Sequence, residues 1–317
     1  MFIGVGVFLA NVAVGFGLVE KIAAFSKYLT RPANLPDEVG TAIVTTAAST
    51  TAGYGMLADF RESERLTDAE TLIAVTMNTF FGFVQHIFTF YAPVLIPILG
   101  LEVGLLYVGA RAAIALGITI TGVFAGAVLL SRGSATDRSE TAAVDGGVEA
   151  TDGGAERSPT PPDSDDDSPA AIVRTAAEKT WPKLTRIIPR LAIIYVAVTL
   201  LVRTQDLRAI TGVAEPLTTL LGLPGASLPV VAVFAFDTTA GAATIAPMIG
   251  PTFTPRTAVA TMLLGGIISF AVSTFKRSIP FQYGIWGPTF GSKVIAVNTA
   301  LKVVFITAAL AVLLVPV

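Results

Sequence analysis

The chain has 317 residues, of which 53% are hydrophobic and 14% charged, with a net charge of −2 and a mean hydropathy of +0.71. So much apolar surface excludes a single water-soluble core and predicts a polytopic protein embedded in the lipid bilayer. The absence of cysteine excludes disulfides, thiol catalysis and thiolate metal sites. We find no catalytic triad order, phosphate loop or metal-ligand spacing, so we expect no enzyme, metal site, cofactor or nucleic-acid binding.

The first half of the chain contains four apolar runs without Asp, Glu, Lys or Arg, and the second half repeats the series. At about 1.5 Å per residue, each run approaches or exceeds the length needed to cross the hydrocarbon core. Eight spans are therefore the base expectation: Phe2–Val19, Val39–Ala58, Thr71–Leu101 and Ala112–Ser131, then Ile187–Val202, Leu228–Pro251, Thr257–Phe275 and Val294–Val317.

The two series share a register. Thr50-Thr51-Ala52-Gly53 returns 188 residues later as Thr238-Thr239-Ala240-Gly241. After one deletion the shift becomes 187, and it aligns Thr67 with Thr254, Phe83 with Phe270, Phe88 with Phe275, Pro93 with Pro280, Gly100 with Gly287 and Gly104 with Gly291. Shared apolar composition does not explain such matches over about seventy positions, so we interpret the chain as two homologous halves.

Four parts follow from this register. A segment of low hydrophobicity separates the halves; its residues 133–170 hold ten of the 23 acidic and two of the 21 basic residues, so they carry −8 and the rest of the chain +6. Such a composition predicts a disordered linker, suited to the high-salt cytoplasm of a halophilic host. The predicted parts are membrane repeat 1 (1–131), the acidic linker (132–171), an amphipathic interfacial helix (172–188) and membrane repeat 2 (189–317).

The amphipathic helix carries Trp181 and several bases, which favours the cytoplasmic interface; a plain continuation of the next span is the alternative. In the 188 register Pro189 corresponds to Met1, so this helix has no counterpart in the first half. Either the first repeat lost it, or the true start lies upstream of Met1 and encodes a similar basic stretch. We expect a multi-pass protein of the cell membrane with a cytoplasmic linker.

Orientation depends on the number of crossings. Four spans per half give parallel repeats and place Arg61, Arg65 and Arg256 on the side of the linker, whereas a fifth crossing near Ala92 to Gly104 gives inverted repeats. The segments 92–104 and 278–291 are rich in Pro and Gly, so we expect broken helices or, alternatively, interfacial loops. The fold class predicted is all-α, with two repeats of about four spans and with broken or re-entrant segments.

Two helix starts are predicted at equivalent positions. Thr67 with Glu70 three residues later forms a capping box pattern. Thr254 followed by Pro255 forms an N-cap with proline in the first turn.

The repeated motif is the strongest candidate for a binding site, because its small and hydroxyl-bearing residues can line a polar path; close helix packing without transport is the alternative. Asp237 stands where the first half has Ser49, and an ionisable residue in an apolar run is a functional candidate. Arg111 and Lys302 could pair with it, or could snorkel. The candidate substrate-binding residues are Ser49, Thr50, Thr51, Gly53, Asp237, Thr238, Thr239, Gly241, Gln85 and His86. For His86 the alternative is a structural histidine of the helix bundle.

Each half has a small-residue segment around Ser/Asp-Thr-Thr-Ala-Gly, a helix of Phe and small polar residues, then Pro and Gly before a final span. This pattern resembles the nucleoside-recognition or Gate domain of spore maturation proteins A and B, of the ferrous-iron transporter B membrane region and of archaeal membrane proteins. A GTPase domain and cysteine are missing, which argues against the iron branch. The resemblance implies recognition of a nucleoside.

Two functional hypotheses follow. In the first, the protein moves a nucleoside or another small polar solute through a site between the repeats. In the second, it is a non-transporting structural or regulatory module that recruits a partner. Either is compatible with a homo-oligomer.

Overall fold

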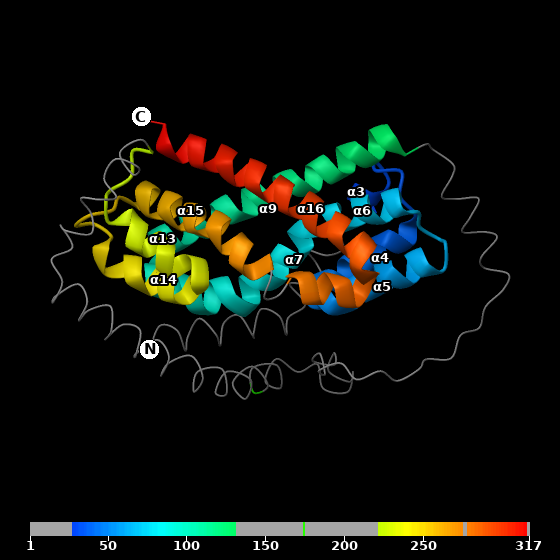
Figure 1. Cartoon of the computed structure of the whole chain (residues 1–317), viewed down its shortest axis with the longest axis horizontal. Coiled ribbons are helices and arrows are strands. Elements are labelled where there is room, and N and C mark those ends of the chain that lie inside the picture. The colour runs from blue at the N-terminus through cyan, green and yellow to red at the C-terminus, as the bar shows by residue number, and fades with distance from the viewer. Residues whose placement is uncertain (1–26, 131–173, 175–220, 275–277, 316–317) are drawn as a thin grey trace. The chain divides into compact units, whose positions relative to one another are not determined.

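The computed structural model describes residues 27–130, 174, 221–274 and 278–315 (Figure 1). These residues are mostly helical and contain no β-strand, which confirms the all-α class for the part of the chain described. Within it, three helical stretches are long and apolar enough to cross a membrane, namely Asp68–Leu99, Leu101–Leu129 and Ile279–Leu314. The predicted first span, the linker, the span at 187–202 and all of the amphipathic helix except residue 174 lie outside the described residues.

The described residues belong to two compact units. The N-terminal unit contains residues 27–85, 118–130 and 174, and the C-terminal unit contains residues 86–117 and 221–315. The units therefore differ from the sequence halves, because residues 86–117 come from the first half but cluster with the second.

The N-terminal unit begins with four helices and the greater part of a fifth: α3 (Lys27–Thr30), α4 (Asp37–Ala48), α5 (Thr50–Glu62), α6 (Asp68–Met77) and α7 (Thr79–His86). The predicted capping box at Thr67 is confirmed: the Glu70 carboxylate accepts the Thr67 N–H at 2.7 Å, and the Thr67 hydroxyl accepts the Glu70 N–H at 3.3 Å. Arg61 and Asp68 form a salt bridge of 2.8 Å across the turn before α6.

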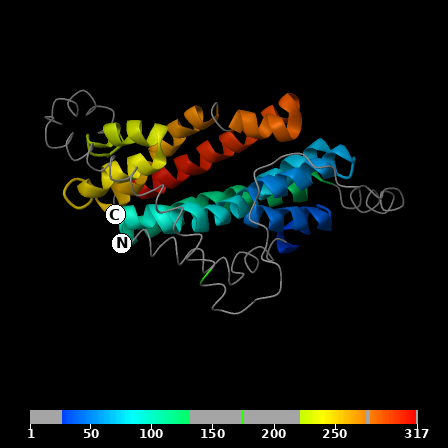
Figure 2. The same ribbon diagram turned by 90° about the horizontal axis from the view of Figure 1, so that it is seen from below.

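The C-terminal unit contains the π-helix η2 (Ile87–Leu95), α8 (Ile96–Leu99) and the first part of α9 (Leu101–Leu129). The second half of the chain adds α13 (Ser227–Phe236), α14 (Thr238–Ile245), the 3-10 helix η3 (Ala246–Met248), α15 (Pro255–Ser273) and α16 (Ile279–Leu314). Thr254 caps α15 with Pro255 in its first turn, as predicted. Figures 1 and 2 both show α15 running beside α16.

Two of the predicted spans are not continuous helices. The backbone leaves the helical conformation at Ser49, between α4 and α5, and at Asp237, between α13 and α14. The longest of these four helices has 13 residues, about 20 Å, against about 30 Å for a hydrocarbon core. The prediction of single spans over 39–58 and 228–251 is therefore wrong. At each break a side chain accepts one N–H of the following helix, and the two helices pack against each other.

Broken backbone was predicted near 92–104 and 278–291, and it is confirmed at equivalent glycines. Gly100, between α8 and α9, has φ 81° and ψ 165°, and Gly287, inside α16, has φ 72° and ψ 168°. This conformation is open to glycine and almost no other residue. The helix resumes immediately after each glycine, so each break is a sharp kink rather than a loop.

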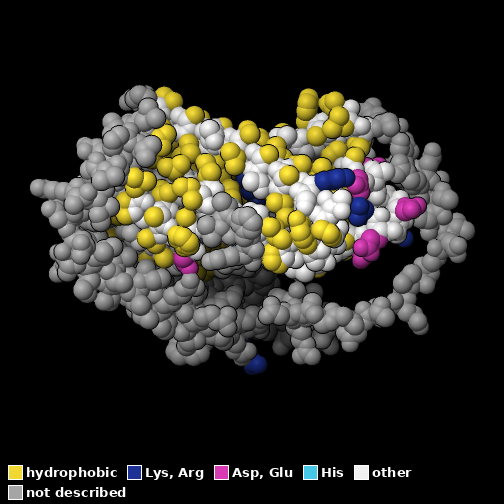
Figure 3. Space-filling model, viewed as in Figure 1, with side chains coloured by type: hydrophobic (Ala, Val, Ile, Leu, Met, Phe, Trp, Pro, Cys, Tyr) yellow, Lys and Arg dark blue, Asp and Glu magenta, His cyan; other side chains and the backbone are white. Residues whose placement is uncertain are grey.

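The surface of these helices is apolar. Figure 3 shows hydrophobic side chains spread over the visible face of α13, α14 and α15. On α9 the exposed side chains include Phe124 (70% exposed) and Leu129 (72% exposed), which is the pattern of a helix facing lipid.

Candidate functional site

The first hairpin, α4 with α5, turns at Ser49. The Ser49 hydroxyl accepts the Ala52 N–H at 3.4 Å and so caps α5. The Thr50 hydroxyl donates to the side-chain oxygen of Gln85 at the end of α7, while Thr51 is exposed. Of the predicted site residues, the structure thus brings Ser49, Thr50 and Gln85 together within the N-terminal unit.

Gly53 serves packing between the two helices of this hairpin. A Cβ at Gly53 would lie 1.8 Å from the Thr46 hydroxyl and 2.7 Å from the Ala42 carbonyl oxygen. The Thr46 hydroxyl itself donates to the Ala42 carbonyl at 3.0 Å and accepts from the Asn78 amide at 2.7 Å. The Asn78 side-chain oxygen is buried and has no hydrogen-bond partner among the described residues. Gly53 therefore has a structural explanation that needs no ligand.

Thr119 of α9 stabilises the junction between α6 and α7. Its hydroxyl donates to the Met77 carbonyl at 2.9 Å and accepts the Phe80 N–H at 3.1 Å. These are two backbone groups beside Asn78, where α6 ends. The sequence analysis missed both Thr46 and Thr119, because a threonine inside an apolar helix carries no local signal of a tertiary hydrogen bond.

The second hairpin, α13 with α14, turns at Asp237. The Asp237 carboxylate accepts the Ala240 N–H at 2.8 Å and caps α14; Asp237, Thr238 and Thr239 are half-buried. A Cβ at Gly241 would lie 2.6 Å from the Phe234 Cα, so this glycine also allows the two helices to touch. Asp237 therefore has at least one defined structural role, that of an N-cap.

The two hairpins have the same local geometry. The backbone angles are φ −145° and ψ 111° at Ser49, and φ −149° and ψ 115° at Asp237. In both, the glycine four residues later packs on the residue three before the break, Thr46 in one and Phe234 in the other. The hairpins lie in different units, and the expected site between the two repeats stays a prediction.

His86 ends α7 and its side chain is exposed. It falls in the C-terminal unit, whereas Gln85 falls in the N-terminal unit. Its contribution to the site stays a prediction.

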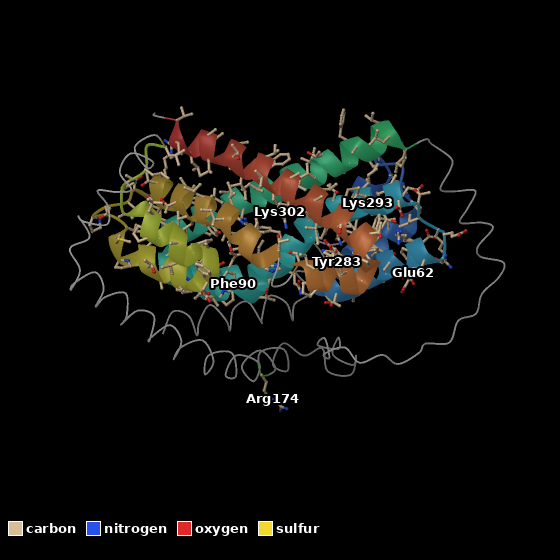
Figure 4. All side chains as sticks on the ribbon, viewed as in Figure 1. Glu62, Phe90, Arg174, Tyr283, Lys293 and Lys302 are labelled. Atoms are coloured by element: carbon tan, nitrogen blue, oxygen red, sulfur yellow. The ribbon has the colours of Figure 1, made fainter. Side chains whose placement is uncertain are left out.

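Two cations lie in the interior of long helices of the C-terminal unit. Arg111 of α9 hydrogen-bonds to the Tyr91 side chain and lies near Tyr107. Lys302 of α16, labelled in Figure 4, has its Nζ 5.4 Å from the centre of the Phe270 ring and lies near Arg111. The sequence suggested both as counter-ions of Asp237, but their neighbours are aromatic. The sequence analysis did not identify Tyr91 or Tyr107.

Ring contacts link this cluster to the second hairpin. The ring centres of Tyr91 and Tyr107 are 6.2 Å apart, and those of Tyr107 and Phe234 are 6.5 Å apart. Phe234 is the residue on which Gly241 packs. A contiguous chain of side chains therefore runs from the cations to the Thr-Thr-Ala-Gly motif of the same unit.

The chain is similar along almost its whole length to two archaeal proteins, both described only as uncharacterized. MJ0880 of Methanocaldococcus jannaschii is 22% identical over 304 residues, covering 94% of this chain and 91% of the relative. MJ0871 of the same organism is 23% identical over 312 residues, covering 96% and 89%. No protein-family model matches the chain, and no solved structure matches it.

Proposed function

We propose that this chain is a transporter-like membrane protein in which the two hairpins line the path of a small polar solute. The observation that carries the proposal is the equivalent extended break at Ser49 and Asp237, each followed by Thr-Thr-Ala-Gly. Interrupted helices at matching positions of two repeats are typical of transporter binding sites.

The chemistry of the breaks suits an uncharged polar ligand with hydrogen-bonding groups. Each break has a hydroxyl or carboxylate cap followed by two threonines at the start of a short helix. At membrane depth, irregular backbone is tolerated only where protein or a water-filled cavity satisfies its polar groups. A nucleoside, which the resemblance to the Gate domain implies, offers ribose hydroxyls to Asp237 and the threonines and base edges to Gln85. His86 is the remaining candidate contact.

The hairpins also favour inverted repeats. If each hairpin enters and leaves the membrane on one side, a half of the chain crosses the bilayer three times rather than four. An odd number of crossings inverts the second half relative to the first. The close approach of α9 to α16 supports a two-fold relation, because Gly117 contacts Phe305. In the 187 register Gly117 corresponds to Val304, the neighbour of Phe305, and Phe305 corresponds to Ile118, the neighbour of Gly117.

The absence of native cysteine makes a direct test of hydration simple. Single variants Thr51→Cys and Thr239→Cys, in membranes, are treated with a water-soluble, membrane-impermeant thiol reagent. We expect both to react, because a solute path is hydrated. Glu62→Cys, at the exposed C-terminal end of α5, is the positive control, and Phe124→Cys, on an apolar helix face, is the negative control.

Transport itself is tested by uptake of radiolabelled uridine into proteoliposomes. We expect uptake by the unmodified protein and a loss of about tenfold in Asp237→Asn, since the substitution weakens the acceptor offered to ribose hydroxyls. Asp59→Asn, at an exposed position, should transport normally. No uptake together with unreactive cysteines at 51 and 239 would contradict the proposal.

The second candidate is a non-transporting module that recruits a partner through the acidic segment 132–171. The tight glycine contacts at Gly53 and Gly241 favour it, because helix packing alone then explains why both motifs have a glycine at the same position. Unreactive cysteines at both motifs are its expected result.

A further inference from the structure

The two cations of the C-terminal unit are deep in their helices. Arg111 lies ten residues after the first residue of α9, or about 15 Å along the helix. Lys302 lies fifteen residues after the kink at Gly287 and twelve before the end of α16. Both positions are close to the middle of a stretch long enough to cross the bilayer.

These two like charges lie near each other, and the contacts that surround them are aromatic. Among the residues that the structure describes, no carboxylate forms a salt bridge with either one. Cations within membrane-spanning helices are costly and are normally paired with an opposite charge or placed on a solute or ion pathway. Two like charges near each other increase that cost.

The helices that carry the pair contact each other through a side chain. A Cβ at Gly117 would lie 2.4 Å from the Phe305 ring, so α9 and α16 are in contact there. Gly117 is six residues after Arg111, and Phe305 is three residues after Lys302. The two cations thus lie on helices that contact each other within two turns of both residues.

We propose that Arg111 and Lys302 together bind an oxyanion, a carboxylate or phosphate group, between α9 and α16. The planar guanidinium presents a fork of N–H donors that matches two oxygens of such a group, and the ammonium adds a point charge. Tyr91 orients the guanidinium through its hydrogen bond, and Tyr107 places a second phenol beside it. This site is independent of the transport proposal, since it requires only that the folded protein bind an anion.

A soluble anion and a phospholipid headgroup share this chemistry. The depth of the two cations favours the soluble anion, because headgroup oxygens lie at the membrane surface while both side chains start near mid-helix. The ring contact of Tyr107 with Phe234 connects the site with the second hairpin, so an anion bound there would lie next to the proposed solute path of the same unit.

The test uses the full-length protein in nanodiscs of phosphatidylcholine, which has no net negative charge. Inorganic phosphate is added at constant ionic strength, maintained with sodium chloride, and the midpoint of thermal unfolding is measured. We expect the midpoint to rise with the logarithm of phosphate concentration once the site begins to fill. Calorimetric titration with phosphate measures the dissociation constant directly.

The variants are Arg111→Gln, Arg111→Lys and Lys302→Gln, with Lys293→Gln as the matched control on an exposed position of the same helix (Figure 4). We expect the dissociation constant for phosphate to be at least tenfold higher in the first three variants and unchanged in Lys293→Gln. Arg111→Lys keeps the charge and removes the fork, so it separates bidentate recognition from charge and guards against loss of folding in the glutamine variants.

A second series contains phosphatidylglycerol and no phosphate. Stabilisation by this lipid alone, lost in Arg111→Gln and Lys302→Gln, supports the oxyanion site with a headgroup as its source. Stabilisation by free phosphate, lost in the same variants, supports it with a soluble source. The proposal is overturned if neither phosphate nor phosphatidylglycerol stabilises the unmodified protein. It is also overturned if the stabilisation is the same in all the variants as in the unmodified protein.

Discussion

At the scale of single residues, the Thr46 hydroxyl determines what position 53 tolerates. A Cβ at Gly53 would overlap this hydroxyl, which already bridges the Ala42 carbonyl and the Asn78 amide. We expect Gly53→Ala to reduce stability by about 1–3 kcal/mol, the usual cost of overpacking. The midpoint of thermal unfolding in detergent checks this.

Gly55→Ala is the control, because a Cβ there meets nothing within 4 Å and alanine favours the helix. Equal midpoints for the two variants would show that the hairpin opens to admit the methyl group.

Thr119 provides a second residue-scale prediction. Thr119→Val keeps the shape but leaves the Phe80 N–H and the Met77 carbonyl without their partner. Because the side chain is fully buried, we expect a loss of about 1–3 kcal/mol in the free energy of unfolding. Thr41→Val, on an exposed position of α4, should change little. A neutral Thr119→Val would contradict the stabilising role assigned to the hydroxyl.

At the scale of elements, the kinks at Gly100 and Gly287 should respond alike to substitution. Both backbones lie in a region that costs other residues about 1–3 kcal/mol, so Gly100→Ala and Gly287→Ala should each lower the unfolding midpoint. Gly109→Ala and Gly284→Ala, each with open space around it, should not. A large effect at one kink and none at the other would argue against equivalent repeats.

The sequence predicted those elements whose signals are local. The caps at Thr67 and Thr254 depend on residues within one turn, and the kinks at Gly100 and Gly287 depend on glycine itself. The breaks at Ser49 and Asp237 were missed, because the spans were assigned from the length of the apolar runs, and one capping residue barely changes that length. A Ser or Asp followed by two threonines is an N-cap signal and could have indicated them.

The surroundings of the candidate site were less predictable. The contact of Thr50 with Gln85 spans 35 residues, and the aromatic neighbours of Arg111 come from η2 as well as from α9. Such contacts depend on how helices pack, for which the sequence has no short-range pattern. The repeat register indicated equivalent positions but not which side chains meet.

At the scale of the whole molecule, the hairpins change the expected topology. Three crossings per half place the loop after α5 and the loop before α15 on opposite sides of the membrane, whereas four crossings place them on the same side. We expect opposite sides. Glu62→Cys and Thr252→Cys, both at exposed positions, are labelled with an impermeant maleimide in right-side-out and inside-out vesicles. Labelling of both variants from the same side would contradict this expectation and support parallel repeats.

The first hairpin also has a consequence for biogenesis. Helices of 12 and 13 residues are too short to be inserted as independent spans, and the polar partners of their threonines, Asn78 and Gln85, are synthesised later. Thr119, which supports the junction beside Asn78, comes later still. We therefore expect the hairpin to lack these partners until the following helices have been synthesised. In this unit the earlier segment would then dock onto the later one.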